Sequence, residues 1–315
     1  MTNALTIAHI SDLHLSAEHK RQNLRRAHRL LSAIRSYHVD HVAFTGDVAA
    51  DATRADFDVA RRLLKGHRLL DPSKLSLVIG NHDVFGGVHT PEDILGYPRR
   101  CRGTDFDGKV EEFRQHFHET FNRSFFASHD RPFPYAKVLG DVVLVGVNSV
   151  APYSKVKNPV GSNGEVDDEQ FGLLQLLLSA PPLKSKRKII LIHHHFHKIV
   201  TIPTGTLGNV WGAVERQTMK MRGKKRLLDL FRLHDVALVM HGHVHTNATY
   251  ERQGVTILNG GGSLLGPGSP RATFNLIRIN QHTVETRTIT VPEEALSIPA
   301  LPPRVYATAD DLLAA

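Results

Sequence analysis

The stretch LTIAHISDLH, residues 5–14, introduces a pattern that recurs along the chain: a short apolar segment followed at once by polar residues. The pattern returns in HVAFTGD (41–47), LSLVIGNHD (75–83), KIILIHHH (188–195) and VALVMHGHVH (236–245). Short apolar segments of this kind are typical strands of a layered α/β protein. Because such sheets place their binding loops after the strand ends, we expect the polar residues to converge at one edge.

Helical patterns separate these strands. Leu24, Ala27, Leu31 and Ile34 recur at steps of three and four residues, which predicts an amphipathic helix. We expect further helices near 56–65, 167–179 and 224–234, and another strand at 142–147. After residue 240 the pattern becomes β-rich, with strands predicted at 255–258, 274–279 and 284–289.

The chain's organisation follows from where this pattern is interrupted. We expect one domain over residues 1–295, with an excursion at about 84–141 and a substrate-side loop at about 196–223. In the excursion, Phe113, Phe117 and Phe121 fall on one helical face, which indicates packing rather than a binding site. Residues 296–315 contain several prolines and are expected to form an extended tail.

Composition limits the class of protein. With 41% hydrophobic and 22% charged residues, the chain has the balance of an ordinary globular protein. Its 39 basic and 31 acidic residues are interspersed, so the net charge of +8 forms no polybasic arm. This charge is compatible with an anionic partner, although a mildly basic surface of a soluble protein is the simpler interpretation. The apolar segments are too short to cross a bilayer, and the first residues do not have the pattern of a signal peptide.

Cysteine use points to the compartment and to the ligands that a metal could find. Cys101 is the only cysteine, so an internal disulfide is excluded and any metal site must use nitrogen and oxygen ligands. A reducing cytoplasm fits this composition best. The 21 histidines supply the commonest protein ligand for transition metals.

The first three polar groups offer carboxylate, imidazole and amide ligands. Asp12 and His14 are two residues apart, so in an extended chain both side chains would point to one side. Asp47 follows a glycine, and its carboxylate could bridge two cations with one oxygen to each. Asn81 offers an amide oxygen. His82 could protonate or stabilise a leaving oxygen, with Asp83 orienting its ring.

The last two groups are histidine pairs and runs. Alternate residues of an extended run diverge, so we expect only one or two of His193, His194 and His195 to be functional. His243 and His245 are again two residues apart and could serve one site together.

Taken in order, the groups D-x-H, GD, GNHD, H and GHxH resemble the calcineurin-like metallophosphoesterase superfamily, over roughly residues 8–245. Residues 143–149, VLVGVNS, add a resemblance to its bacterial cyclic-nucleotide-phosphodiesterase-like branch. The resemblance implies an α/β (α+β) fold, a four-layer αββα sandwich of two mixed sheets flanked by helices. It also implies a pair of metal ions, held by Asp12, His14, Asp47, Asn81, His193, His243 and His245.

Within that ligand set, the resemblance assigns Asp12, His14 and His245 to one ion and makes Asp47 the bridge to the other. His82 lies beside the metals without being a ligand. The branch has His-His-Pro-Pro where this chain has His193-His194-His195-Phe196, and the first of these positions is the usual ligand. Losing both prolines removes rigidity beside the substrate, so the branch's cyclic-nucleotide substrate stays open.

The implied reaction is hydrolysis of a phosphodiester or phosphomonoester by a hydroxide that bridges the ions. The ligands suit Mn, Fe, Zn or Co, with Mn or Fe favoured. The expected partner is a small anionic phosphate ester, contacted by His195 and Trp211, and a homodimer stays open. The alternatives are a nuclease or nucleotide-lipid pyrophosphohydrolase, a protein phosphatase, and a non-catalytic interaction module on the same fold.

Overall fold

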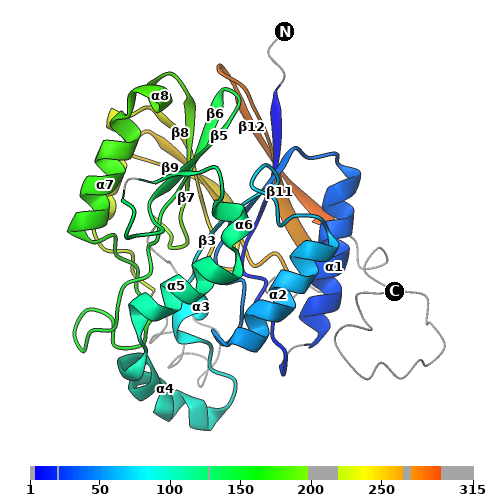
Figure 1. The fold of residues 1–315 in the computed structure, drawn as a ribbon, viewed down its shortest axis with the longest axis vertical. Coiled ribbons are helices and arrows are strands. Elements are labelled where there is room, and N and C mark those ends of the chain that lie inside the picture. Colours follow the sequence, from blue (N-terminus) through cyan, green and yellow to red (C-terminus); the bar gives the residue numbers. More distant parts are fainter. Residues whose placement is uncertain (1–3, 20, 127, 198–218, 265–270, 292–315) are drawn as a thin grey trace, which may run out of the picture.

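Two mixed β-sheets form the centre of the computed structural model, which describes residues 4–19, 21–126, 128–197, 219–264 and 271–291 (Figure 1). The five-stranded sheet has the order β12-β11-β1-β2-β3, and the seven-stranded sheet has the order β4-β5-β6-β7-β8-β10-β9. The first sheet consists of β1 (Leu5–Ile10), β2 (His41–Thr45), β3 (Leu75–Val78), β11 (Ala272–Ile279) and β12 (Val284–Val291). The second consists of β4 (Phe125–Phe126), β5 (Tyr135–Leu139), β6 (Val142–Gly146), β7 (Arg187–Leu191), β8 (Val236–His241), β9 (Asn247–Arg252) and β10 (Val255–Gly260).

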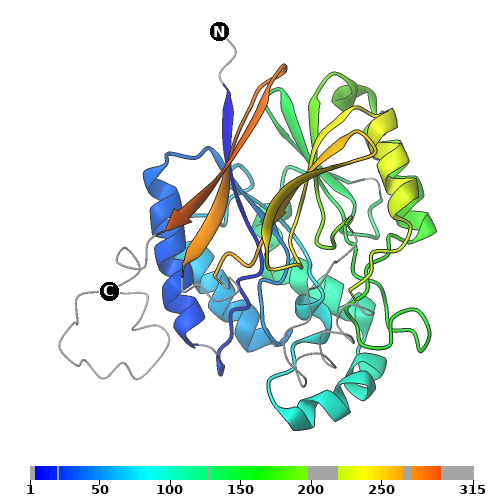
Figure 2. The same ribbon diagram turned by 180° about the vertical axis from the view of Figure 1, so that it is seen from behind.

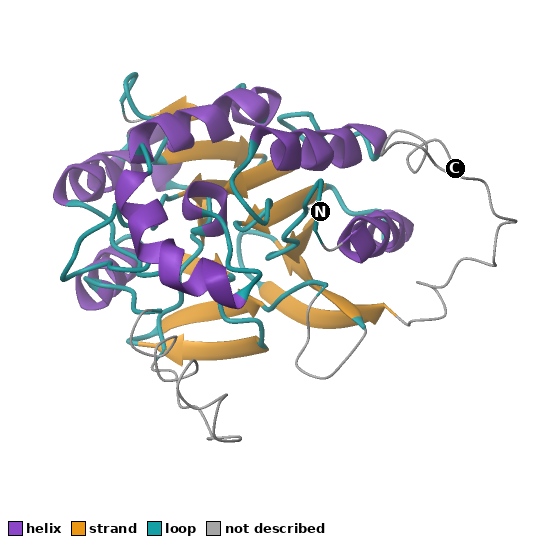
Figure 3. Cartoon of the chain, turned by 90° about the horizontal axis from the view of Figure 1, so that it is seen from below, coloured by secondary structure: helices purple, strands orange, loops and turns teal. Residues whose placement is uncertain are grey.

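Helices cover the outer faces of both sheets, which gives the four-layer αββα sandwich that the sequence predicts (Figure 3). Figure 1 shows α1 and α2 outside the first sheet and α7 outside the second, and Figure 2 shows α10 in yellow on the second sheet's side. The described helices are α1 (Arg21–Ser36), α2 (Arg54–Gly66), α3 (His82–Phe85), α4 (Pro91–Gly103), α5 (Phe106–His116), α6 (His118–Phe121), α7 (Asp168–Ser179), α8 (Pro181–Lys184) and α10 (Lys224–Leu233).

The strands that precede the polar groups run parallel within each sheet. β1 pairs with β2 and β2 with β3, while β7 pairs with β8 in the other sheet, all in parallel register. The carboxyl ends of β1, β2 and β3 therefore share one edge, as do those of β7 and β8. Antiparallel partners such as β11, β9 and β5 complete the two mixed sheets.

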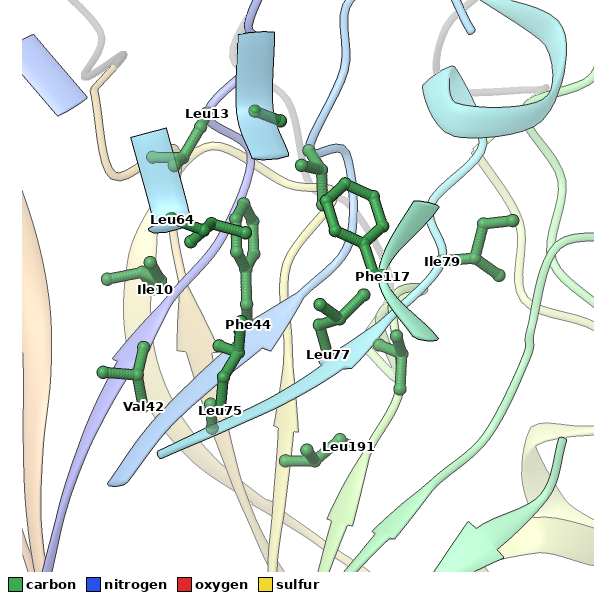
Figure 4. Close-up of a cluster of buried hydrophobic side chains, with 14 of the residues drawn as sticks. Ile10, Leu13, Val42, Phe44, Leu64, Leu75, Leu77, Ile79, Phe117 and Leu191 are labelled. Atoms are coloured by element: carbon green, nitrogen blue, oxygen red, sulfur yellow. The ribbon is translucent and has the colours of Figure 1, made fainter. Parts of the chain in front are cut away.

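The apolar core holds this edge in place. Phe44 of β2, Leu77 of β3 and Leu191 of β7 are at most 1% exposed and belong to one cluster that joins the two sheets (Figure 4). Full burial of such a side chain contributes about 1.5–3 kcal/mol. These residues lie a few positions before the ligand-bearing loops. The packed core therefore fixes the position at which each of these loops begins.

Most of the predicted elements are confirmed, and three strands, β4, β5 and β9, were missed. The apolar stripe of α1 is buried, and so are Phe113, Phe117 and Phe121, although the helix is interrupted at Phe117, where α5 ends and α6 begins. The excursion includes β5, which pairs fully with β6 and is part of the sheet. Lys137, at the centre of β5, is buried, but as a charged residue type it interrupts the apolar pattern from which a strand is predicted. β9 was also missed, because it is polar and partly exposed.

Candidate metal centre

The polar groups do converge, but the backbone that brings them together is not extended. Asp12, His14, Asp47 and His243 all have positive φ, between 44° and 69°. Such left-handed conformations are costly for residues other than glycine, and they cluster at functional sites where the surroundings enforce them. The side chains of Asp12 and His14 do face one site, but not through strand alternation as predicted, because neither residue has an extended backbone. Each turns out of the strand instead.

Hydrogen bonds between loops enforce these conformations. The Asp12 amide donates to the Gly46 carbonyl at 3.0 Å, and the His14 amide donates to the Asp47 carbonyl at 3.0 Å. Within the second sheet, the Gly242 amide donates to the His193 carbonyl at 3.1 Å. Between the two sheets, the His243 amide donates to Asp12 Oδ2 at 3.1 Å. The loops after β1, β2, β7 and β8 thus form one connected scaffold.

One group of ligand atoms combines Asp12, His14 and His245. The Nε2 atoms of His14 and His245 lie 3.3 Å apart, and His245 Nε2 lies 3.5 Å from Asp12 Oδ1. Ligands bound at about 2.1 Å to one metal ion are themselves about 3–3.5 Å apart. Asp12 and His14 are buried, whereas the His245 side chain is 41% exposed, so this group faces solvent on the His245 side.

A second group combines His193, His243 and Asn81. His193 Nε2 lies 3.0 Å from Asn81 Oδ1 and 3.2 Å from His243 Nδ1. The other nitrogen of His193, Nδ1, is 2.8 Å from the Thr45 carbonyl oxygen and donates to it, which fixes the orientation of the ring. All three side chains are at most 5% exposed, so this group is the more enclosed of the two.

Asp47 lies between the two groups. Its Oδ2 is 3.4 Å from His193 Nε2 on one side and 3.8 Å from His14 Nε2 on the other. Its Oδ1 is turned away and accepts a hydrogen bond of 2.8 Å from the His82 amide. The expectation of one oxygen for each cation is therefore corrected: a single oxygen faces both groups, because the backbone of His82 holds the other.

Glycines leave the space in which the carboxylates approach the backbone. A Cβ on Gly80 would lie 2.2 Å from Asp47 Oδ1, and one on Gly242 would lie 2.4 Å from Asp12 Oδ2. Both separations are far shorter than any non-bonded contact. The glycines of the GNHD and GHxH groups are thus required by the packing of the ligands themselves.

The electrostatics of the site favour a bound cation. Burial opposes ionisation of Asp47, but the charges of His193 and His82 hold the pKa of this carboxyl well below its usual range. Burial lowers the pKa of His193, but Asp47 outweighs it and raises that pKa to about 9. A proton on His193 thus supplies the positive charge that Asp47 requires, and metal binding would release it.

His82 lies beside the ligands, while Asp83 has a different function from the one predicted. The rings of His82 and His14 are 4.5 Å apart, and His82 Nδ1 is 3.2 Å from the Ala50 carbonyl oxygen. The two carboxylate oxygens of Asp83 instead accept hydrogen bonds from the amides of Ala49 and Gly80. Asp83 therefore joins two ligand loops and does not orient the His82 ring.

The run of histidines also departs from simple alternation. Strand β7 ends at Leu191, and the chain bends at His193 and His194. As a result, the rings of His193, His194 and His195 all lie within 5.9 Å of the His243 ring. His195 is 2% exposed and its Nδ1 has no hydrogen-bond partner among the described residues. Trp211, the other predicted substrate contact, lies outside the described residues.

Sequence reasoning missed the support beneath this run. The Ser149 hydroxyl lies 2.8 Å from His194 Nδ1 and accepts the His194 amide at 3.1 Å. Ser149 follows β6, in the stretch VLVGVNS, so its position after a strand end was the available signal. A cavity of about 960 Å³ lies nearby, lined by Asn148 and Gln170 among others, and its lining includes none of the seven predicted ligands.

The donor set fits a pair of transition metal ions. Among the described residues, four groups of three His, Asp or Glu residues meet the geometry for a metal. Two of them consist entirely of predicted ligands, Asp12-His14-His245 and Asp47-His193-His243, and Asn81 adds an oxygen to the second. Mixed imidazole and carboxylate ligands suit first-row transition metals. Fold and site together define a dimetal hydrolase of the αββα sandwich class.

The comparison with protein families agrees. The model of the calcineurin-like phosphoesterase family, Metallophos, matches residues 5–247, and the chain belongs to this family. It is accordingly a metal-dependent phosphoester hydrolase. Comparison of the sequence with curated proteins gives no match.

Solved structures share the fold at low sequence identity. A dimetal phosphatase from Danio rerio is 15% identical with a TM-score of 0.58, covering 91% of this chain and 98% of that one. Purple acid phosphatase PPD1 from yellow lupin seeds is 13% identical with a TM-score of 0.57, covering 98% and 58%. GAP50, the anchor in the inner membrane complex of Plasmodium, is 13% identical with a TM-score of 0.51, covering 91% and 85%. These similarities show the fold.

No helix in the described part of the chain combines the length and the apolar character needed to span a membrane.

Proposed function

We propose that the chain hydrolyses small anionic phosphate esters, diesters or monoesters, with two transition metal ions held by Asp12, His14, Asp47, Asn81, His193, His243 and His245. Mn or Fe is favoured, with Zn and Co as the other candidates. The observation that carries the proposal is the position of Asp47 Oδ2, within 3.8 Å of a histidine nitrogen in each of the two ligand groups. An oxygen in this position can be shared by two ions.

When bound, two such ions supply a hydroxide nucleophile at neutral pH and neutralise the charge of phosphate oxygens. The residues of this chain hold the ions, orient the ester and handle the proton of the leaving group. The exposed side of the Asp12-His14-His245 group is the approach for the ester, because the second group is enclosed. The cytoplasm remains the expected location, because Cys101 is the only cysteine.

His82 is the proposed acid. Its Nδ1 donates to the Ala50 carbonyl oxygen, so Nε2 is the nitrogen that would present a proton to a leaving oxygen when the ring carries both protons. Its ring is next to that of His14, so His82 lies at the edge of the metal centre, and neither of the two ligand groups includes it. His82 also belongs to a third group of ligand atoms, His14-Asp47-His82. Metal analysis of a His82 variant therefore has to accompany its kinetics.

A substrate panel on Mn²⁺-loaded protein tests the function. It would compare aryl phosphomonoesters, aryl phosphodiesters, cyclic nucleotides, nucleotide sugars and single-stranded DNA. We expect chelator-sensitive hydrolysis of at least one small ester, with cyclic nucleotides as the first natural candidates. Turnover confined to single-stranded DNA would favour the nuclease alternative. Absence of hydrolysis across a wider panel, with both metals bound, would favour a non-catalytic module.

A second experiment tests the acid role. An alkoxide leaving group needs a proton, whereas nitrophenolate leaves readily, so His82→Ala should lower kcat by about 10²–10⁴-fold on alkyl diesters and much less on aryl diesters. Both metals should remain bound. Equal losses on the two substrates would reject the acid role and leave an electrostatic one. Loss of a metal would make His82 a ligand.

A further inference from the structure

A second histidine and aspartate cluster lies apart from the seven ligands. His19 comes from the loop after β1, Asp51 from the loop after β2, and His89 from the segment between α3 and α4. His89 Nε2 is 2.5 Å from Asp51 Oδ1, and the rings of His19 and His89 are 4.6 Å apart and tilted by 33°. One candidate ligand atom from each residue lies within 4.8 Å of the others.

From this arrangement we propose that His19, Asp51 and His89 bind a third divalent transition metal ion. Two imidazoles and one carboxylate form a ligand set that proteins use for Zn, Fe and related ions, with the remaining positions filled by water or substrate. A simple hydrogen bond between Asp51 and His89 would not require another residue beside it. The ring of His19 completes the ligand set, so His19 is the residue that distinguishes a metal site from a hydrogen-bonded pair.

The loops that carry His19 and Asp51 are fixed to each other before any ion binds. One carboxylate, that of Asp56, accepts the Ala17 amide at 2.8 Å and the Asp51 amide at 3.0 Å. The amide of His19 itself donates to Ser16 Oγ at 3.0 Å. The backbones of two of the three ligands are therefore positioned by side chains that take no part in binding, as in a preorganised site.

The segment that carries His89 is fixed in the same way. The amides of His89 and Thr90 both donate to Asp93 Oδ2, at 3.1 Å each, in the capping box of α4. The amide of Gly87 lies 3.4 Å from Asp51 Oδ1, which draws the segment towards the carboxylate. The third ligand thus approaches the other two with its backbone already held.

The cluster is open to solvent, which gives an ion a path of entry and predicts weaker binding than at the buried centre. The side chains of Asp51 and His89 are 18% and 14% exposed, and His19 is exposed. An ion here would hold residues 86–90 against the loop that contains Ala50. Because the Ala50 carbonyl accepts the Nδ1 proton of His82, the third ion would steady the proposed acid.

The test is a zinc titration of the full chain by equilibrium dialysis with elemental analysis. We expect the wild type to bind two Zn²⁺ tightly and a third more weakly. His19→Ala should weaken the third equivalent by at least about tenfold and leave the first two unchanged. His89→Gln should do the same. His282→Ala removes an exposed histidine in the turn between β11 and β12, and as the control it should still bind three.

Two results would overturn the proposal: a wild type that saturates at two Zn²⁺ or fewer, or a His19→Ala variant that retains the third equivalent at full affinity. Since His19 is exposed, its replacement leaves the packing intact, and a folding defect of His89→Gln does not affect the conclusion. If the first two Zn²⁺ ions do not bind, the result counts against the dimetal centre. If only the third Zn²⁺ ion does not bind, the result counts only against the cluster of His19, Asp51 and His89.

Discussion

Two regions of this protein use the same residue types in loops at the same edge of the fold, yet they are built differently. At the dimetal centre, four ligands have left-handed backbones, and glycines without a Cβ leave the space that the carboxylates occupy. Every ligand there except His245 is at most 5% exposed. In the cluster of His19, Asp51 and His89, side-chain caps hold ordinary loops near solvent. Burial and backbone strain therefore distinguish the proposed dimetal centre from the proposed third site.

The sharpest way to break this comparison is one chemical change made in both regions. Asp47→Asn places a neutral amide between the two ligand groups, so we expect loss of metal and a fall in kcat of roughly 10³-fold or more. Asp51→Asn makes the matched change in the cluster and should keep both tightly bound metals. Elemental analysis with steady-state kinetics on both variants decides. An active, fully loaded Asp47→Asn enzyme would refute the bridging role.

The next effect separates neighbours within the centre. His193 Nε2 faces Asn81 and Asp47, whereas the ring of His195 stacks on that of His243 with the centroids 5.9 Å apart. His193→Ala should therefore weaken one metal by about 10–100-fold or more, and His195→Ala far less. Metal affinities from competition with a chelator measure the difference. Equal losses in the two variants would mean that the ligand of this run is misassigned.

The smallest effect concerns the segment that connects the two regions. A Cβ on Gly87 would lie 3.0 Å from His82 Cε1 and Nδ1 and 3.1 Å from the Ala50 carbonyl oxygen, so the His82 ring must shift by a few tenths of an ångström. Gly87→Ala should lower kcat by about tenfold or less, with metal content unchanged, because small misplacements of a catalytic group slow the reaction. Gly172→Ala, where nothing lies within 4 Å, is the control. A fully active Gly87→Ala enzyme would show that this segment does not hold the His82 ring in its catalytic position.

The dimetal centre could be predicted from the sequence because its residues follow strand ends in short, compact groups. Asp12, Asp47 and His243 each come directly after an apolar run, and parallel pairing brings those ends together. What alternation could not give was the local backbone. Positive φ at Asp12 and His14 and the bend at His193 depend on hydrogen bonds to loops far away in the sequence.

The cluster could not be predicted, for a related reason. His19, Asp51 and His89 lie several residues beyond the strands, and their meeting depends on the Asp56 carboxylate and the capping box of α4. His19 stands among polar residues and is exposed, which in a sequence is typical of a solvated histidine rather than of a ligand. Similarly, β5 escaped prediction because Lys137, at its centre, is buried with hydrogen bonds to the carbonyls of Leu75 and Thr120.

The central claim is that a single oxygen of Asp47 is shared by two metal ions. Anomalous diffraction from crystals of the Mn²⁺-loaded protein tests it most directly. We predict two strong peaks, roughly 3.5–4 Å apart as in other two-metal sites, one beside His14 and His245 and one beside His193 and His243, with Asp47 Oδ2 between them. One peak at saturating Mn²⁺, or two peaks of which only one contacts Asp47, would contradict the account.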